Sequence, residues 1–231
     1  MLGAGISQLL NWLSHQQWEK GAVLGKAACY GLLLCILVLY GMRTVKRNAD
    51  WKDELTFYSR LVEDNSYSAR ARLGLGMIYD RSGMPRMAIT HYHIGLTLSP
   101  SDPRLYTNLG ASYQKLGMLN QAERAYNTAL QIVPNDMRVY SNLGFLYTEL
   151  RQYDKARAAL EKAQQLSHGK DPVVYANLGV LYEDLGEWQQ ARQAYQKAVA
   201  LSPTNNVFAL KLKTVEKKLE TSDSQGNKIA Q

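Results

Sequence analysis

Two kinds of side chain that can bind peptides recur along the chain at intervals of 34 or 35 residues. The carboxamides are Asn108, Asn142 and Asn177, and the guanidinium groups are Arg70, Arg104 and Arg138. A carboxamide both donates and accepts hydrogen bonds, so it can bind the main chain of an extended peptide whatever its side chains are. Guanidinium groups beside it would favour carboxylate or phosphate groups on that peptide. The two series therefore predict a peptide-binding surface, provided that the fold brings them together.

Residues that could carry catalysis or bind a metal are not spaced for either task. His91 and His93 are two residues apart on a predicted helix and point to different sides, whereas chelation needs a spacing of three or four. The stretch 74–76 (Gly-Leu-Gly) lies inside a predicted helix, so it is a packing feature and not a phosphate-binding loop. The only cysteines, Cys29 and Cys35, form no CxxC pair. We therefore expect no enzyme activity, no cofactor and no metal site.

The charge of the chain does not favour a nucleic-acid partner. The net charge of +7 is spread along the 231 residues, without a block of like charges. A basic chain without such a block is weak evidence for binding DNA or RNA. No nucleic-acid partner is therefore expected.

The elements that would position the two series follow one repeated pattern. Its second copy consists of Tyr106, Leu109, Gly110, Tyr113, Ala122, Tyr126, Ala129 and Pro134. These residues occupy positions 4, 7, 8, 11, 20, 24, 27 and 32 of a unit that starts at Pro103. In a pair of antiparallel helices, small residues at positions 8 and 20 let the helices approach closely, while large residues at 4, 7, 11 and 24 fill the space between pairs. Proline at position 32 ends the second helix because it cannot continue one.

This pattern resembles the tetratricopeptide repeat, a helical hairpin of 34 residues. Four repeats are expected, at 69–102, 103–136, 137–171 and 172–205. The first is degenerate, since Arg72 replaces the aromatic residue at position 4 and Gly95 stands at position 27. The third has one inserted residue and no proline, and we expect its second helix to end near His168–Gly169. The resemblance implies an all-α solenoid of helical hairpins, whose first helices line a concave groove.

Both ends of the repeat array are predicted to carry a capping helix. Upstream, residues 51–68 match the second helix of a half-repeat. Downstream, residues 206–220 contain apolar side chains at helical spacing and lysines on the other side, which is typical of a capping helix. Residues 221–231 lack apolar content, so this tail is expected to be disordered. Four repeats with two caps exceed the roughly three repeats that a stable array needs.

An apolar segment precedes the repeats. Residues 21–42 contain Lys26 as their only charge, and as a helix they would span roughly 33 Å, about the thickness of the hydrocarbon core of a bilayer. We expect a retained transmembrane helix here. The alternative is a cleaved signal peptide, although the apolar run starts late and no small-x-small cleavage site follows it. Residues 1–20 would be an interfacial helix or the remnant of an earlier span, and residues 43–50 a basic linker to the repeats.

The junction after this segment resembles a second family. Residues 39–54 combine the end of an apolar helix with the pattern Arg-Thr-x-x-Arg-Asn-x-x-Trp, and the repeats follow. This order is similar to the C-terminal part of O-mannosyltransferase-like membrane glycosyltransferases. The resemblance implies a non-catalytic accessory or detached portion of such a system, because this chain lacks the early loops that carry the catalytic acids of that family. It also implies extracytoplasmic repeats. The basic residues do not decide the orientation, because three follow the segment (Arg43, Lys46 and Arg47) and two lie at its N-terminal end (Lys20 and Lys26).

Two interpretations remain open for the recurring asparagines and arginines. Asparagine at position 6 resembles the asparagine ladder of the O-GlcNAc transferase repeat domain, where such residues grip peptide main chain. It is also a common residue at that position in the repeat family, and position 2 is often simply exposed. The carboxylate-clamp subtype, which binds chaperone C-termini, needs lysine at position 5 and asparagine at position 9, and this chain has neither. We expect a single-pass membrane scaffold that binds an extended segment of a protein partner; association with a polytopic membrane glycosyltransferase is the alternative.

Overall fold

The computed structural model describes Val38 and residues 54–229. No helix in that part of the chain is both long enough and apolar enough to cross a membrane. The predicted transmembrane segment 21–42 lies outside the described residues except for Val38, and so do residues 1–20 and the junction up to residue 53. The outcome of those predictions is therefore not decided by the structure.

All elements in the described part of the chain are α-helices, and eight of them form four consecutive hairpins. The hairpins are α3 (Ala69–Arg81) with α4 (Pro85–Leu98), α5 (Pro103–Lys115) with α6 (Leu119–Ile132), α7 (Met137–Glu149) with α8 (Tyr153–Leu166), and α9 (Pro172–Asp184) with α10 (Trp188–Leu201). The helix α2 (Glu54–Asp64) precedes them and α11 (Asn206–Ile229) follows them. Each hairpin falls inside one of the four expected repeat ranges.

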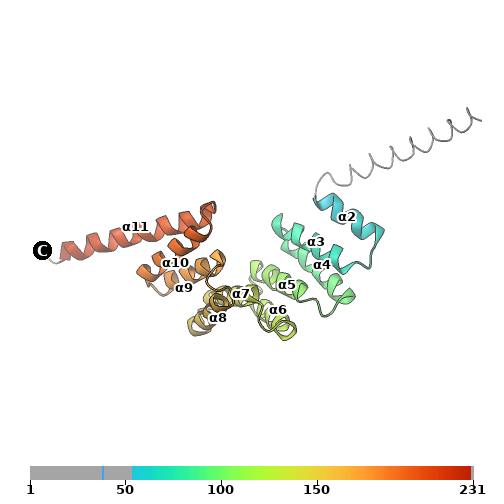
Figure 1. Ribbon diagram of the computed structural model, residues 1–231, viewed down its shortest axis with the longest axis horizontal. Helices are drawn as coiled ribbons and strands as arrows, with labels where there is room; N and C mark the ends of the chain where they lie inside the picture. The colour runs from blue at the N-terminus through green and yellow to red at the C-terminus, as the bar shows by residue number, and fades with distance from the viewer. Residues whose placement is uncertain (1–37, 39–53, 230–231) are drawn as a thin grey trace, which may run out of the picture. The chain divides into compact units, whose positions relative to one another are not determined.

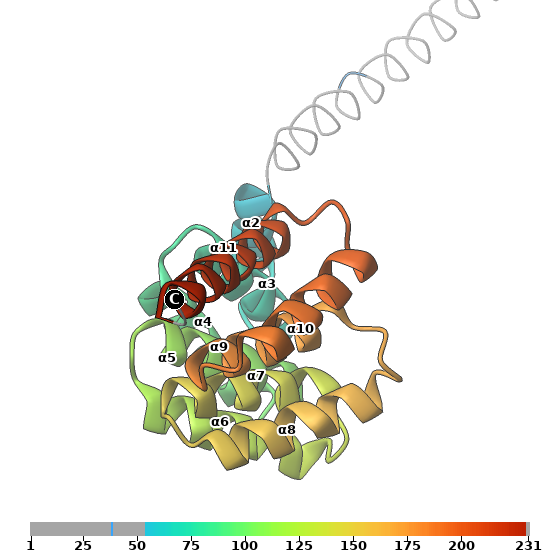
Figure 2. The same cartoon turned by 90° about the vertical axis from the view of Figure 1, so that its left-hand side faces the viewer.

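The hairpins belong to one of the two compact units of the chain, Leu61–Gln231, and the other unit is Met1–Arg60. Within Leu61–Gln231 the hairpins follow one another in chain order (Figure 1, Figure 2). The first helices of the hairpins, α3, α5, α7 and α9, contact one another in that order, and each second helix also contacts the first helix of the next hairpin. Buried side chains form three clusters along this unit instead of one central core. This is the nearest-neighbour packing expected of a solenoid.

Glycine at position 8 allows the two helices of each hairpin to touch. A Cβ atom added to Gly110 would lie 2.6 Å from the ring of Tyr126, and one added to Gly144 would lie 2.4 Å from Leu160. The equivalent glycines in the first and fourth hairpins face tyrosines at similarly short distances. The alanines at position 20 are fully buried: Ala88, Ala122, Ala156 and Ala191. The expected role of small residues at positions 8 and 20 is thus confirmed.

Each first helix begins with a side chain that caps its free backbone N–H groups. Asp102 and Asp136 each accept a hydrogen bond from the backbone N–H of the second residue of their helix, and Asp171 accepts two, from Val173 and Val174. Ser68 caps α3 by accepting from the N–H of its third residue, Ala71. Such a cap contributes about 1 kcal/mol to the stability of a helix. The caps fix where each first helix starts. Asp102 and Asp136 also bind the side chains of Arg104 and Arg138, two of the arginines at position 2.

The structure differs from the sequence prediction at the C-terminal end. The expected capping helix of 206–220 and disordered tail of 221–231 are replaced by a single helix, α11, that continues to Ile229. Phe208 and Val215 are buried against the fourth hairpin, as the apolar stripe predicted. Beyond residue 220 the only apolar residues are Ile229 and Ala230, and the chain contains no proline that would prevent the backbone hydrogen bonds from continuing. Low apolar content predicts that a segment packs little against the rest of the protein. It does not predict where a helix ends.

Candidate peptide-binding groove

The three asparagines at position 6 lie on consecutive first helices. Asn108, Asn142 and Asn177 are half-buried residues of α5, α7 and α9, and these helices contact one another. Asn177 is engaged in packing, because its amide donates hydrogen bonds to the carbonyl oxygen and to the hydroxyl of Ser141, at 3.2 and 3.0 Å. The fold therefore brings the asparagine series together, and one member already joins two repeats. We call the surface formed by α3, α5, α7 and α9 the groove.

The arginines at position 2 are paired with the aspartates that cap their own helices. Arg104 donates to both carboxylate oxygens of Asp102, at 3.0 and 2.7 Å, and Arg138 approaches the carboxylate of Asp136 at 3.3 Å. The hydrogen bond from Arg104 lowers the pKa of the Asp102 carboxyl. Arg70 lies at the equivalent place, where the cap is the neutral Ser68. The positive charge that Arg104 and Arg138 offer to a ligand is thus reduced by a local partner.

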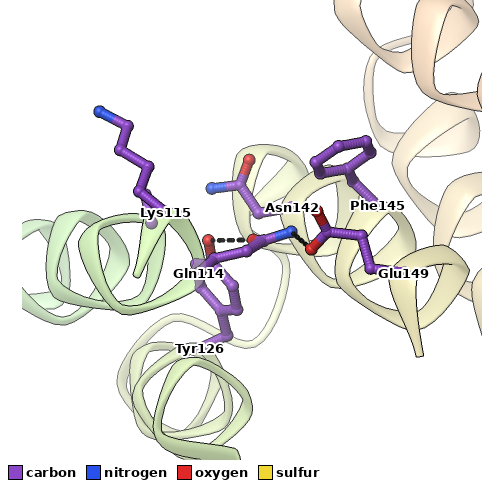
Figure 3. A pocket seen from close by; sticks show the side chains of 7 residues that line it. Gln114, Lys115, Tyr126, Asn142, Phe145 and Glu149 are labelled. Carbon is purple, nitrogen blue, oxygen red and sulfur yellow. Dashed lines mark hydrogen bonds between the residues drawn. The ribbon is translucent and has the colours of Figure 1, made fainter. Parts of the chain in front are cut away.

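A pocket of about 260 Å³ lies between α5 and α7 (Figure 3). Its lining residues are Ala111, Gln114, Lys115, Tyr126, Asn142, Phe145 and Glu149. Ala111 of α5 and Phe145 of α7 both occupy position 9 of their repeats. The small side chain of Ala111 leaves room in the pocket, and the ring of Phe145 lines it from the next first helix. We call this site the α5–α7 pocket. It includes Asn142, the middle member of the asparagine series.

Hydrogen bonds join three residues that line the pocket (Figure 3). The Tyr126 hydroxyl donates to Gln114 Oε1 at 3.1 Å, and Gln114 Nε2 donates to Glu149 Oε2 at 2.6 Å. Burial, followed by the negative charges of Glu149 and Asp80, raises the pKa of the Tyr126 phenol well above its usual value. Tyr126 is therefore protonated at neutral pH and holds Gln114, which in turn holds the Glu149 carboxylate.

The bond between Tyr126 and Gln114 recurs elsewhere in the array. The tyrosine at position 24 donates to a polar side chain at position 12 in the first hairpin, from Tyr92 to Asp80 at 3.1 Å, and in the fourth, from Tyr195 to Glu183. The third hairpin replaces both partners at once: Leu160 stands at position 24, and Thr148 at position 12 bonds to a carbonyl of its own helix. A tyrosine at position 24 thus occurs with a polar residue at position 12 that accepts its hydrogen bond, and where the tyrosine is absent that acceptor is absent as well.

Residues at position 12 also join neighbouring repeats. Lys115 lies 3.3 Å from Asp80 Oδ1, and the Ser112 hydroxyl donates to Asp80 Oδ2 at 2.6 Å. In the same way Lys211 of α11 lies 3.3 Å from Glu183. The first two contacts join α3 to α5, and the third joins α9 to α11. These polar groups therefore help to fix the position of each repeat relative to the next.

The comparison with protein families decides the nature of the repeats. Residues 101–166 and 135–204 match the family model of the tetratricopeptide repeat. The second, third and fourth hairpins are tetratricopeptide repeats. The match begins after the N-terminal junction, and the resemblance of that junction to O-mannosyltransferase-like enzymes is not part of it.

Solved structures share the fold of the tetratricopeptide array at low sequence identity. A thermophilic tetratricopeptide-repeat protein of Thermus thermophilus gives a TM-score of 0.65 at 23% identity, over 70% of this chain and 88% of that one. A chain in the APC/C hetero-tetramer Cut9–Hcn1 gives 0.66 at 22% identity, over 72% of this chain and 33% of that one. MamA of Desulfovibrio magneticus RS-1 gives 0.54 at 20% identity, over 70% and 91%. No curated protein matches the sequence.

The tetratricopeptide framework explains which groove residues the sequence pattern did not indicate. Gln114 and Glu149 stand at positions 12 and 13, outside the signature, and Tyr126 was interpreted only as a packing residue. The signal that could have found them is the co-occurrence of tyrosine at position 24 with a polar residue twelve positions earlier, as in Tyr92 and Asp80. The pairing of Arg104 was visible as an Asp-x-Arg pattern that begins at Asp102.

The histidines considered for metal binding make separate contacts. His91 stacks on Tyr79, with ring centroids 5.2 Å apart, whereas His93 Nε2 lies 2.9 Å from the hydroxyl of Tyr113. Burial and the charge of Arg72 lower the pKa of His91. In the part of the chain that the structure describes, no three His, Cys, Asp or Glu side chains are grouped so that they could hold a metal ion.

Proposed function

We propose that the tetratricopeptide array is a scaffold that binds an extended segment of a protein partner along the groove. The observation that carries this proposal is the α5–α7 pocket, which lies between two first helices and includes Asn142. Tetratricopeptide repeats generally act as protein-interaction scaffolds, and one structural relative is a chain of the Cut9–Hcn1 hetero-tetramer. The structural similarity to that relative supports the fold. At 22% sequence identity it does not indicate which partner this chain binds.

The proposed mechanism uses Asn108 and Asn142 to bind the main chain of the segment. Packed helices lie about 8–10 Å apart and an extended chain rises about 3.3 Å per residue, so neighbouring first helices would contact the segment about every three residues. Each carboxamide can both donate to a carbonyl and accept from an N–H group of the segment. Asn177 contributes less, because its amide already binds Ser141. Side chains of the segment then enter the space between the carboxamides.

Replacing Asn108 and Asn142 together by alanine should abolish most peptide binding without unfolding the array. Phage-displayed random 12-residue peptides would be selected on the purified full-length chain, and the enriched peptides synthesised with a fluorescent label. Loss of two main-chain contacts should weaken their binding roughly tenfold to a hundredfold, as measured by fluorescence polarisation.

The matched control for this experiment replaces Asn120 and Asn127, which are exposed on α6, by alanine. The control variant should bind the peptides as the wild type does, and circular dichroism should show equal helix content in both variants. Peptides that bind the Asn108/Asn142 variant and the wild type equally would show that the groove is not the binding surface.

We further propose that residues 21–42 anchor the scaffold in a membrane, with the repeats on the extracytoplasmic side. The support is the sequence itself, since this segment is apolar over the length that a bilayer requires. Deleting residues 21–42 should move the chain from the carbonate-washed membrane fraction to the supernatant, whereas deleting the polar residues 221–231 should not. Recovery of the wild-type chain in the supernatant would contradict the anchor.

The side of the membrane and the partner class can be tested in the same preparation. In sealed inside-out vesicles, extracytoplasmic repeats should resist added protease until detergent opens the vesicles, and immediate digestion would place them in the cytoplasm. Co-purification of a polytopic glycosyltransferase would favour the accessory role that the resemblance of the junction implies.

A further inference from the structure

The α5–α7 pocket contains a carboxylate whose charge no neighbouring cation balances. Glu149 accepts a hydrogen bond from the amide of Gln114, and within the described part of the chain it forms no ion pair with a Lys, Arg or His side chain. Lys115 also lines the pocket, but its ammonium group pairs with Asp80 at 3.3 Å and approaches the Asp80 carbonyl oxygen. Figure 3 shows Lys115 and Glu149 on opposite sides of the pocket. The unbalanced charge of the pocket is therefore negative.

The position of Glu149 in its helix increases the preference for a positive group. Glu149 is the last residue of α7, and the C-terminal end of a helix carries a partial negative charge that favours cations. An incoming cation would thus meet a carboxylate at the C-terminal end of a helix.

The walls and size of the pocket limit what can enter it. Phe145 presents an aromatic ring beside the small side chain of Ala111, so a long hydrocarbon stem can pack between them. The volume of about 260 Å³ is below the roughly 300–1,000 Å³ that is usual for small-molecule sites. The pocket therefore suits a single long side chain better than a separate ligand.

We propose that the α5–α7 pocket binds an arginine side chain of the extended segment, with its stem along Ala111 and Phe145 and its guanidinium group on Glu149. This inference rests on the proposed function of the groove. Arginine fits because its planar fork pairs with carboxylates and stacks on aromatic rings, whereas the ammonium group of lysine does neither as well. The sequence suggested acidic or phosphorylated peptides from the arginines at position 2, but two of those arginines have local partners. The preferred segment is therefore basic at this point.

The test uses the peptides that are selected on the full-length chain from the random 12-residue library. Enriched peptides should share an arginine, and replacing it by citrulline, which keeps the shape and removes the charge, should weaken binding about tenfold or more. The variant Glu149→Gln should bind the arginine and citrulline peptides equally well. The matched control is Glu161→Gln on α8, an exposed acid away from the pocket, which should keep the wild-type preference.

The outcomes separate this inference from the proposed function. Peptides that depend on Asn108 and Asn142 but share no arginine, or that keep their preference in the Glu149→Gln variant, would overturn the inference and leave the groove model standing. Equal binding of lysine and arginine peptides would overturn it as well. No enrichment over a blank surface, or binding that ignores Asn108 and Asn142, would overturn both.

Discussion

Replacing Gly110 by alanine should destabilise the array by roughly 1–3 kcal/mol. In an open helix the same substitution is expected to stabilise by about 1 kcal/mol, because alanine is the better helix former. Here the added methyl group would lie 2.6 Å from the Tyr126 ring, and the hydroxyl of that ring is held by Gln114. A rigid, anchored ring cannot move by a few tenths of an ångström as a flexible side chain can. The two helices of the hairpin must separate instead, which weakens their packing.

Urea denaturation of the full-length chain, followed by circular dichroism, would measure this loss. The chain offers a matched control in Gly95→Ala, since Gly95 is also a buried helical glycine. A methyl group there would meet the end of the Leu105 side chain at 2.8 Å, and that end can rotate. The control should cost less than Gly110→Ala, because the added methyl group meets the end of a flexible side chain and not an aromatic ring. A Gly110→Ala variant that is as stable as the wild type would contradict this prediction, because it would show that α5 and α6 can separate to accommodate the methyl group without a loss of stability.

The features that the sequence predicted are those that every hairpin needs. Gly110 and Tyr126 are signature residues because two helices at this separation require a small residue opposite a large one, and the requirement returns with each repeat. The asparagine series was placed on the correct helices for the same reason, since a period of 34 or 35 residues returns a side chain to the same face. A regular pattern can therefore give both the fold and the position of Asn142.

The features that it did not predict depend on one repeat or on local partners. The α5–α7 pocket requires alanine at 111 and phenylalanine at 145, a difference between two copies of position 9 that a shared pattern averages away. The charge of Arg104 was interpreted without Asp102, although the two residues are close in sequence and the aspartate was needed as a cap. The continuation of α11 to Ile229 was missed because composition indicates where packing ends and not where backbone hydrogen bonds end.

Replacing Tyr195 by alanine should have the largest effect on stability, a loss of about 3–5 kcal/mol. Tyr195 is fully buried between α9 and α10, and its hydroxyl donates to Glu183. Truncation leaves a cavity beside Gly179 and removes the bond that holds Glu183 near Lys211 of α11. Because a repeat contacts only its neighbours, the damage should spread to the capping helix before it reaches the first hairpin. The matched control is Tyr67→Ala, since Tyr67 is 82% exposed and its loss should cost little.

The variant Tyr195→Phe separates the ring from the hydroxyl. It keeps the volume and loses one hydrogen bond to a charged group, so it should cost about 1.5–3 kcal/mol. Burial and then the hydrogen bond to Glu183 raise the pKa of Tyr195 above the value of 10.0 that the unfolded chain would have. The stabilisation is therefore complete below pH 10 and decreases above it, because the unfolded chain releases this proton first. Between pH 9 and pH 11, on the order of one unit either side of that pKa, wild-type stability should fall more than that of the phenylalanine variant. Equal slopes would show that the hydroxyl contributes no pH-dependent stability.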